Sequence, residues 1–313
     1  MESALIRFLF QKFMFIVASL FVLATATFVL MKVIPGNPFL SEKTPKAIQE
    51  RIMAYYGLDR PIWEQYLTYM GKLLQGDFGI SMKYQHRSVM TIIEDSFFLS
   101  AQLGIVSVIA SVVVGVGLGV IAALKHRKLL DNFTMVLAVL GVSIPSFVLA
   151  PVLQLYFSAK LQWFPVTKLD HWYSYVLPTI ALSSLSVAFI ARLTRSTMIE
   201  VLQSDYIRTA RAKGLSGLVV TTRHALRNAL LPVVTYVGPL TANVITGSIV
   251  IEKVFGIAGI GEHFVTSIHN RDYTLIMGLT LFYGIILMVC RFLTDVAYVL
   301  VDPRIKLIGK KGG

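Results

Sequence analysis

The sequence contains very little cysteine and little charge. Its single cysteine, Cys290, lies in an apolar run, so the chain can form no intrachain disulfide framework and offers no cysteine-based metal site. Charged residues make up only 15% of the 313 residues, whereas hydrophobic residues make up 55%. A soluble domain carries more charge and fewer apolar residues than this. The composition therefore indicates a chain whose main solvent is a lipid bilayer.

Signatures of catalysis and nucleotide binding are also missing. No Gly-x-x-x-x-Gly-Lys-Ser/Thr phosphate loop occurs, so the chain has no recognisable means of holding ATP. The six histidines are scattered, and none forms the His-Glu-x-x-His pair of a metalloprotease. A Gly-x-Gly-x-Gly run at 115–119 lies within an apolar stretch with no strand before it, which argues against a nucleotide fingerprint. The sequence predicts that this chain is not an enzyme and binds no cofactor or metal.

Long apolar runs are the main feature that is present. A helix needs about 20 apolar residues to cross roughly 30 Å of hydrocarbon. Six uncharged runs of sufficient length occur, at residues 13–31, 96–124, 132–159, 172–191, 228–251 and 273–290, the last continuing toward 301. We therefore predict an all-α membrane protein with six transmembrane helices and both termini on one side. The first run has no small-residue cleavage site after it, so we interpret it as a retained helix and not a signal peptide.

The positive charge of the chain indicates how it is oriented. The formal net charge is +12, from 29 Lys and Arg against 17 Asp and Glu. Short cytoplasmic loops of membrane proteins are enriched in Lys and Arg. The turn at 125–128, the loop at 192–227 and the tail after 303 are all basic, and they share one side if the N-terminus is cytoplasmic. The sequence thus predicts cytoplasmic termini, and the excess charge requires no nucleic-acid partner.

The loop between the fourth and fifth runs carries a short basic helix. We expect this helix to begin after Ser204, which can act as its N-cap, and to end at Gly214. Asp205 lies in its first turn and the basic residues follow, as the helix dipole favours: Arg208, Arg211 and Lys213. Tyr206, Ala210 and Gly214 recur every four residues and would share one docking face. A basic amphipathic helix lying on anionic lipid fits the same residues.

The same loop resembles a known family motif. The segment D-Y-I-R-T-A-R-A-K-G-L, followed by R-N-A-L-L-P, is similar to the cytoplasmic coupling loop of binding-protein-dependent ABC importer permeases, and R-T-A-R-A-K-G is typical of the peptide and nickel branch. In that family the loop docks into a cleft on the ATPase subunit. The resemblance implies that ATPase coupling involves Asp205, Tyr206, Arg208, Thr209, Ala210, Arg211, Ala212, Lys213 and Gly214.

Further segments along nearly the whole chain resemble the B subunit of oligopeptide permeases. They lie at residues 35–39, 56–61, 75–81, 141–147, 252–261, 270–273 and 302–307. The resemblance implies the type I ABC importer permease fold in a bacterial inner membrane. It also implies a second, C-type permease subunit, two ATP-binding subunits that hold ATP and Mg, an extracytoplasmic peptide-binding protein and an oligopeptide substrate. A dipeptide or nickel permease of the same family is the alternative.

These expectations divide the chain into four parts. Residues 1–34 form the cytoplasmic N-terminus and the first transmembrane helix, and residues 35–95 form an extracytoplasmic segment. Residues 96–303 form the transmembrane core with its cytoplasmic coupling loop at 199–231, and residues 304–313 form a cytoplasmic tail. The extracytoplasmic segment is a candidate contact surface for the binding protein, or alternatively a cap over the pore.

Two charged residues fall within the last run. Arg291 and Asp295 are four residues apart and would share one helix face, so we predict an intramembrane ion pair between them. Placement of Arg291 in the translocation path is the alternative. A proton-coupled secondary transporter would be expected to carry a carboxylate deep in its spans, and apart from Asp295 the six runs contain none. A membrane sensor would need a signalling domain larger than these loops.

Overall fold

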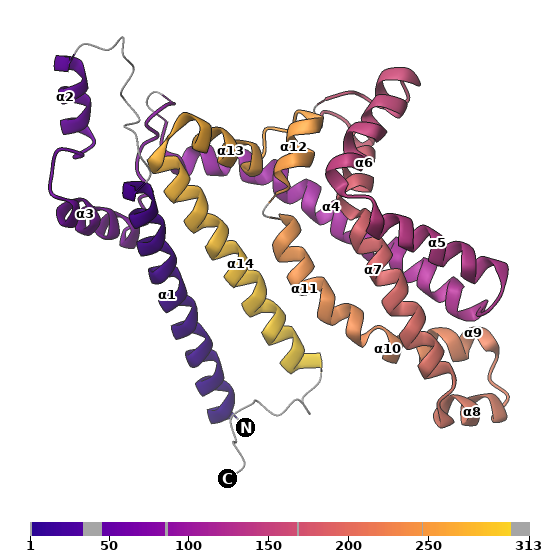
Figure 1. Ribbon diagram of the computed structural model, residues 1–313. Coiled ribbons are helices and arrows are strands. Elements are labelled where there is room, and N and C mark those ends of the chain that lie inside the picture. Colours follow the sequence, from indigo (N-terminus) through magenta and orange to yellow (C-terminus); the bar gives the residue numbers. More distant parts are fainter. Residues whose placement is uncertain (1, 34–45, 85–86, 168, 246, 302–313) are drawn as a thin grey trace.

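The computed structural model describes residues 2–33, 46–84, 87–167, 169–245 and 247–301, and these residues fold almost entirely into helices (Figure 1). Within this part of the chain the only strand-like feature is an isolated antiparallel bridge between Ile80 and Ser88. The predicted all-α fold is confirmed. The family-like segments at 35–39 and 302–307, and the predicted tail at 304–313, lie outside the described residues.

Within the described ranges, four helices are individually long and apolar enough to cross a membrane. They are α1 (Glu2–Val33), α4 (Val89–Leu124), α7 (Val176–Leu202, with the 3₁₀ turn Trp172–Tyr175 before it) and α14 (Tyr273–Val301). Two further spans are bent helix pairs, which brings the total to as many as six. The six predicted runs thus correspond to four single helices and two broken ones.

The third predicted run, residues 132–159, is not one continuous helix. It comprises α5 (Leu129–Ser143), α6 (Ser146–Leu153) and the π-helical turn Gln154–Lys160, and the chain bends by 102° at the break. The cause is Pro145, because a proline disfavours helical backbone in the residue before it. Ile144 is accordingly extended, with ψ 111°.

The fifth predicted run, residues 228–251, is wrong at both ends. A helical segment made of α9 (Gly217–Val219), the π-helical turn Val220–Ala225 and α10 (Leu226–Ala229) leads into α11 (Leu231–Ile245) with a bend of 51°. The last apolar residues of the run belong to a separate helix, α12 (Ile249–Phe255), which is followed by α13 (Ile260–Asn270). Apolar composition alone does not separate these helices.

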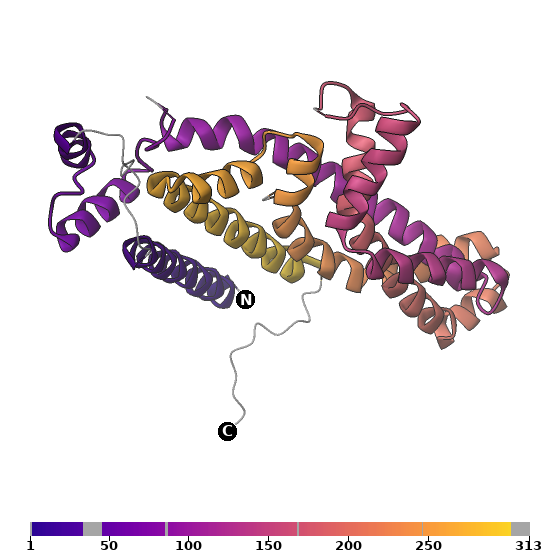
Figure 2. The same cartoon turned by 45° about the horizontal axis from the view of Figure 1, so that its top comes forward.

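The spanning helices form a row in which each contacts the next: α1, α14, α11, α4, α7 and α5. Figures 1 and 2 show α2 (Lys46–Tyr55), α3 (Ile62–Leu74), α12 and α13 near the ends of the spanning helices at which α1 finishes and α14 begins. The short helix α8 (Asp205–Ala212) lies at the opposite end, the same end as the start of α1. The two ends therefore present different loops to the two membrane surfaces.

Close packing of α4 against α7 explains the glycine run. A Cβ added at Gly119 would lie 2.5 Å from Thr194 Cβ, and one added at Gly115 would lie 2.8 Å from Ile190 Cβ. Gly117, on another face of α4, has open space around it. Gly115 and Gly119 therefore let two membrane helices approach closely, as small residues do in helical membrane proteins.

Candidate functional site

The helix α8 begins where the sequence predicts, but its N-cap differs in detail. Ser204 has the extended backbone of an N-cap residue (φ −69°, ψ 153°). Its hydroxyl donates to the Val201 carbonyl at 2.6 Å and does not accept from an α8 backbone N–H. Asp205 lies in the first turn and Arg211 in the last, which suits the helix dipole.

Gly214 ends α8 in the left-handed conformation that the sequence predicts. Its φ is +78°, and a Cβ added there would meet nothing within 4 Å. The Gly214 N–H donates to the Arg211 carbonyl at 2.9 Å and the Leu215 N–H donates to the Ala210 carbonyl at 3.4 Å. These two bonds are those of a Schellman motif, which satisfies carbonyls at a helix C-terminus. The turn is thus set by backbone conformation and not by crowding.

One side of α8 packs against its own chain. Ile207 is 0% exposed and Ala210 is 6% exposed. Both belong to a buried cluster with Met198 at the end of α7, Ala123 at the end of α4, and Val220, Ala225 and Ala229 from the segment after α8. The prediction that Ala210 lies on an outward docking face is therefore wrong. The sequence shows the amphipathic pattern of α8. Which of its small residues is buried depends on packing against α4, α7 and the segment after α8.

The other predicted coupling residues are exposed and lie together on one surface. They are Asp205, Tyr206, Arg208, Thr209, Arg211, Ala212, Lys213 and Gly214, which we call the α8 surface. The Asp205 and Arg208 side chains form an exposed ion pair at 3.4 Å, of the kind that adds little stability. The Tyr206 hydroxyl accepts from Asn228 Nδ2 at 2.8 Å, which ties α8 to α10. The α8 surface is basic, and the helix that carries it is anchored to its own chain through Tyr206 and the buried cluster.

The sequence does not predict a buried ion-pair network that joins the turn between α4 and α5 to α7. The Asp131 side chain at the start of α5 is 2% exposed, and it accepts from Arg195 Nε at 2.5 Å and Arg195 Nη2 at 2.8 Å. The Arg127 backbone N–H also donates to this carboxylate at 2.9 Å, and His126 Nδ1 lies 3.2 Å from it. This network fixes the turn between α4 and α5 to α7, the helix from which α8 extends. No local sequence signal joins two residues 64 positions apart.

Asp295 pairs with a different helix from the one predicted. Lys12 Nζ of α1 lies 2.6 Å from Asp295 Oδ2, whereas Arg291 is exposed and no ion pair joins it to Asp295. The predicted Arg291–Asp295 pair is therefore wrong. A base four residues before an acid is the less favourable order on a helix, and α1 supplies a cation across the contact between α1 and α14.

A double-mutant cycle tests this pairing. Lys12→Gln and Asp295→Asn are expected to show a coupling of about 0.5–1 kcal/mol in the free energy of unfolding, because the pair is partly exposed. The matched cycle with Arg291→Gln and Asp295→Asn is expected to be additive within about 0.3 kcal/mol. Unfolding of the purified chain in detergent measures both cycles, and a larger coupling for Arg291 would contradict the structure.

At the opposite end of the bundle, a buried carboxylate joins the family-like segment at 252–261 to α4. Glu252 in α12 is 0% exposed and accepts from the Ser100 hydroxyl at 2.7 Å and the Glu262 N–H at 3.2 Å. Burial raises the pKa of the Glu252 carboxyl, while these hydrogen bonds lower it. Ser100 also accepts from the Ile260 N–H at 2.9 Å. Two buried hydrogen bonds to Ser100 therefore hold the segment at 252–261 against α4.

A second buried carboxylate joins segments that are almost 200 residues apart. Asp272, 0% exposed, accepts from the Ser81 hydroxyl and from the backbone N–H groups of Met82 at 3.1 Å and Leu275 at 3.1 Å. The segments at 75–81 and 270–273, which the resemblance picks out separately, thus form one structure at the start of α14.

Within the described residues, no group of three His, Cys, Asp or Glu side chains is arranged to hold a metal ion.

The described residues form a multi-pass bundle of membrane-spanning helices with the basic α8 surface at one end. The chain matches the family model "Binding-protein-dependent transport system inner membrane component" over residues 115–307, and the model of the family's N-terminal region over residues 5–103. It belongs to this family of inner-membrane permease components of ABC importers.

Its relatives match over nearly their full lengths. The dipeptide transport system permease protein DppB of Bacillus subtilis is 50% identical over 98% of this chain and 99% of its own. The oligopeptide transport system permease protein OppB of Escherichia coli is 43% identical over 96% of this chain and 100% of its own. The inward-facing MetNI methionine ABC transporter contains a chain that superposes with a TM-score of 0.53 at 15% identity, covering 68% of this chain and 97% of that one. This likeness confirms the ABC permease fold.

Proposed function

We propose that this chain is one of two membrane-spanning subunits of an ATP-driven bacterial importer, and that its substrate is a peptide. The observation that supports the substrate class is the 41–50% identity, over nearly the whole chain, to permeases named for dipeptides or oligopeptides. An oligopeptide is the proposed substrate and a dipeptide is the alternative, because relatives of both kinds match end to end. Nickel, the other branch of the resemblance, is the third substrate to test.

The proposed assembly follows from the family and from the resemblance of the α8 loop. A second, C-type permease subunit completes the pore, and an extracytoplasmic protein delivers the peptide. Two ATP-binding subunits hold ATP and Mg, and one of them docks on the α8 surface. In this arrangement both termini of the chain are cytoplasmic. The chain itself hydrolyses nothing. The protruding, basic α8 surface supports this arrangement, because Arg208, Arg211 and Lys213 are exposed where acidic groups of an ATPase can contact them.

Reconstituted transport tests the proposal. The chain, purified with its neighbouring subunits and placed in proteoliposomes, is expected to import labelled pentapeptide only when ATP is enclosed on the α8 side and binding protein is present on the other. Uptake of dipeptide and nickel under the same conditions ranks the alternatives. A proton ionophore should leave uptake unchanged. Uptake that requires a proton gradient and no ATP would contradict the importer and identify a secondary transporter.

A further inference from the structure

A pocket with a volume of about 460 Å³ lies at the end of the bundle opposite α8. Its walls come from the last turn of α1, the segment 54–60, α3, the segment 77–82 and the first turns of α14. The volume is within the range of small-molecule sites. The α8 surface does not involve this pocket. Most of its lining residues belong to the segment 35–95, for which a contact with the binding protein or a cap over the pore is expected, and neither expectation assigns a ligand to the pocket.

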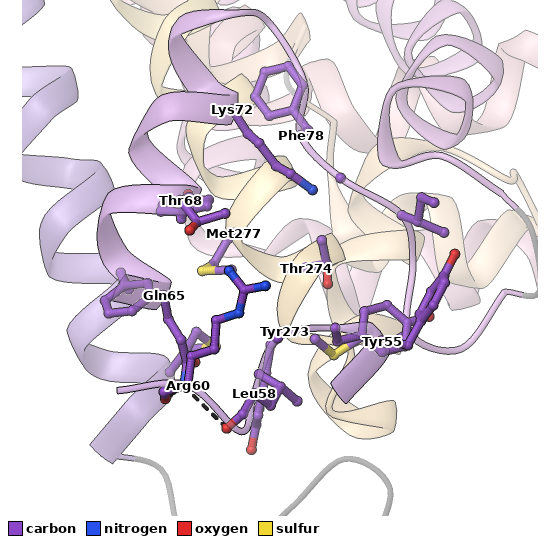
Figure 3. Close-up of a pocket in the computed structure, with 18 of the residues that line it drawn as sticks. Tyr55, Leu58, Arg60, Gln65, Thr68, Lys72, Phe78, Tyr273, Thr274 and Met277 are labelled. Carbon is purple, nitrogen blue, oxygen red and sulfur yellow. Dashed lines mark hydrogen bonds between the residues drawn. The ribbon is translucent and has the colours of Figure 1, made fainter. Parts of the chain in front are cut away.

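The charges in the pocket are mainly positive. Its charged lining residues are Lys32, Arg60 and Lys72 against a single acid, Asp77. Lys32 donates to Gln65 Oε1, and the Asp77 carboxylate accepts from the Gly79 N–H at 2.8 Å. No ion pair joins Arg60 or Lys72 to another residue in the described part of the chain. Figure 3 shows Arg60 and Lys72 approaching the same space from opposite sides, with Thr274 and Met277 of α14 beside it. The chemistry suits an anion.

The contacts between α3 and α1 place this pocket at the depth of a membrane surface. The Tyr66 hydroxyl lies 2.8 Å from Thr25 Oγ1, and Tyr66 and Tyr69 both contact the Phe28 ring. Thr25 and Phe28 belong to the span Phe10–Val33. At 1.5 Å per residue, Thr25 lies about 12 Å inside the end of that span. Helix α3 therefore packs beside the last two turns of a membrane-spanning helix.

The outward side of α3 supports the same placement. Its exposed apolar residues are Ile62, Trp63, Leu67 and Leu74, with Trp63 at 64% and Leu74 at 88% exposure. No residue of α3 is buried. An amphipathic helix with exposed tryptophan and leucine beside the end of a span is typical of helices that lie in the membrane interface. Thr68, Tyr69 and Lys72 line the pocket on the other side of the same helix.

We propose that this pocket binds the phosphate headgroup of an anionic phospholipid, with Arg60 and Lys72 contacting the phosphate. The lipid's acyl chains would lie along α1, where Val29 and Leu30 are 51% and 59% exposed. Phospholipid is the occupant that satisfies both observations, because only a lipid brings an anion and an apolar chain to the same depth. The Tyr69 hydroxyl, which is buried without a hydrogen-bond partner among the described residues, supplies a further polar group in the pocket wall.

Binding of short-chain phosphatidylglycerol to the purified full-length chain in detergent tests this proposal, with phosphatidylcholine of the same chain length as the uncharged comparison. One cation near a membrane surface contributes a factor of about five in affinity, so Arg60→Gln with Lys72→Gln should weaken phosphatidylglycerol binding by roughly 30-fold. Phosphatidylcholine binding should change little. Thr68→Trp keeps every charge but fills the pocket, and should weaken phosphatidylglycerol binding as well. The matched control, Arg51→Gln with Lys83→Gln, removes two cations outside the pocket and should leave binding unchanged.

Three results would overturn the proposal. The first is equal loss of phosphatidylglycerol binding in the control variant, which would indicate general surface charge. The second is displacement of the lipid by inorganic phosphate at the same concentration, which would assign the pocket to a soluble anion. The third is a pocket variant that keeps phosphatidylglycerol binding but loses peptide uptake, which would assign the pocket to a transport partner. Failure of the lipid test leaves the peptide-transport experiment unaffected, because lipid binding is measured on the chain alone.

Discussion

Replacement of Arg195 by leucine is expected to lower the free energy of unfolding by about 3–5 kcal/mol, because the change leaves Asp131 buried without its counter-ion. The Asp131 carboxylate is 2% exposed and receives two of its hydrogen bonds from this one guanidinium. The remaining donors, His126 and the Arg127 N–H, do not replace a full charge. The same change should loosen the turn between α4 and α5 from α7.

Unfolding of the purified chain in detergent, followed by tryptophan fluorescence, measures this loss. Arg192→Leu is the matched control, since Arg192 lies on the same helix, is exposed and forms no ion pair with the described residues. Arg192→Leu is expected to change the free energy of unfolding by no more than about 0.5 kcal/mol. An equal loss in both variants would show that leucine on this helix, and not the broken pair, causes the destabilisation.

Removal of both charges should restore much of the lost stability. Replacing both partners of a buried ion pair with apolar residues of similar volume is often close to neutral, whereas removing one partner is costly. Asp131→Leu combined with Arg195→Leu is therefore expected to be more stable than Arg195→Leu alone. The Arg127 N–H loses its acceptor in the double variant, so recovery should stop short of the parent by about 1–3 kcal/mol.

The parts of the fold that sequence reasoning predicts depend on local physics. The apolar runs predict the spans because the length of a membrane helix is set by the bilayer. Ser204 and Gly214 predict the ends of α8 because capping depends on a few adjacent residues, although the Ser204 hydroxyl makes a different bond from the expected one.

The parts that it does not predict depend on contacts between distant segments. Pro145 indicates a break in the third run, but not a bend of 102°, which is set by packing of α5 and α6 against α7. The partner of Asp295 is on α1, and the inward side of α8 is decided by residues from α4, α7 and the segment after α8. Among the candidate site residues, sequence reasoning misjudged the direction of Ala210 and the partner of Asp295, and the ATPase contact of the exposed α8 residues stays a prediction.

Replacement of Gly214 by valine is expected to reduce peptide-stimulated ATP hydrolysis by about 5- to 150-fold in the assembled transporter. A β-branched residue at φ +78° costs about 1–3 kcal/mol, and α8 can avoid this cost by unwinding its last turn. Because nothing lies within 4 Å of the added Cβ, the strain stays in the loop and the membrane subunits should still assemble. If the α8 surface transmits force to an ATPase, the variant should lose peptide-stimulated ATP hydrolysis and keep subunit assembly.

Two variants separate backbone conformation from added bulk. Gly214→Asn should retain most of the coupled hydrolysis, because asparagine tolerates left-handed backbone better than valine does. Gly217→Val adds the same bulk in the same loop at a position with ordinary φ and open space, and should also retain activity. Equal losses in Gly217→Val and Gly214→Val would point to bulk on the surface. Full coupled hydrolysis in Gly214→Val would contradict ATPase docking. It would favour the alternative in which α8 lies on anionic lipid. A frayed last turn would still leave Arg208 and Arg211 free to contact lipid headgroups.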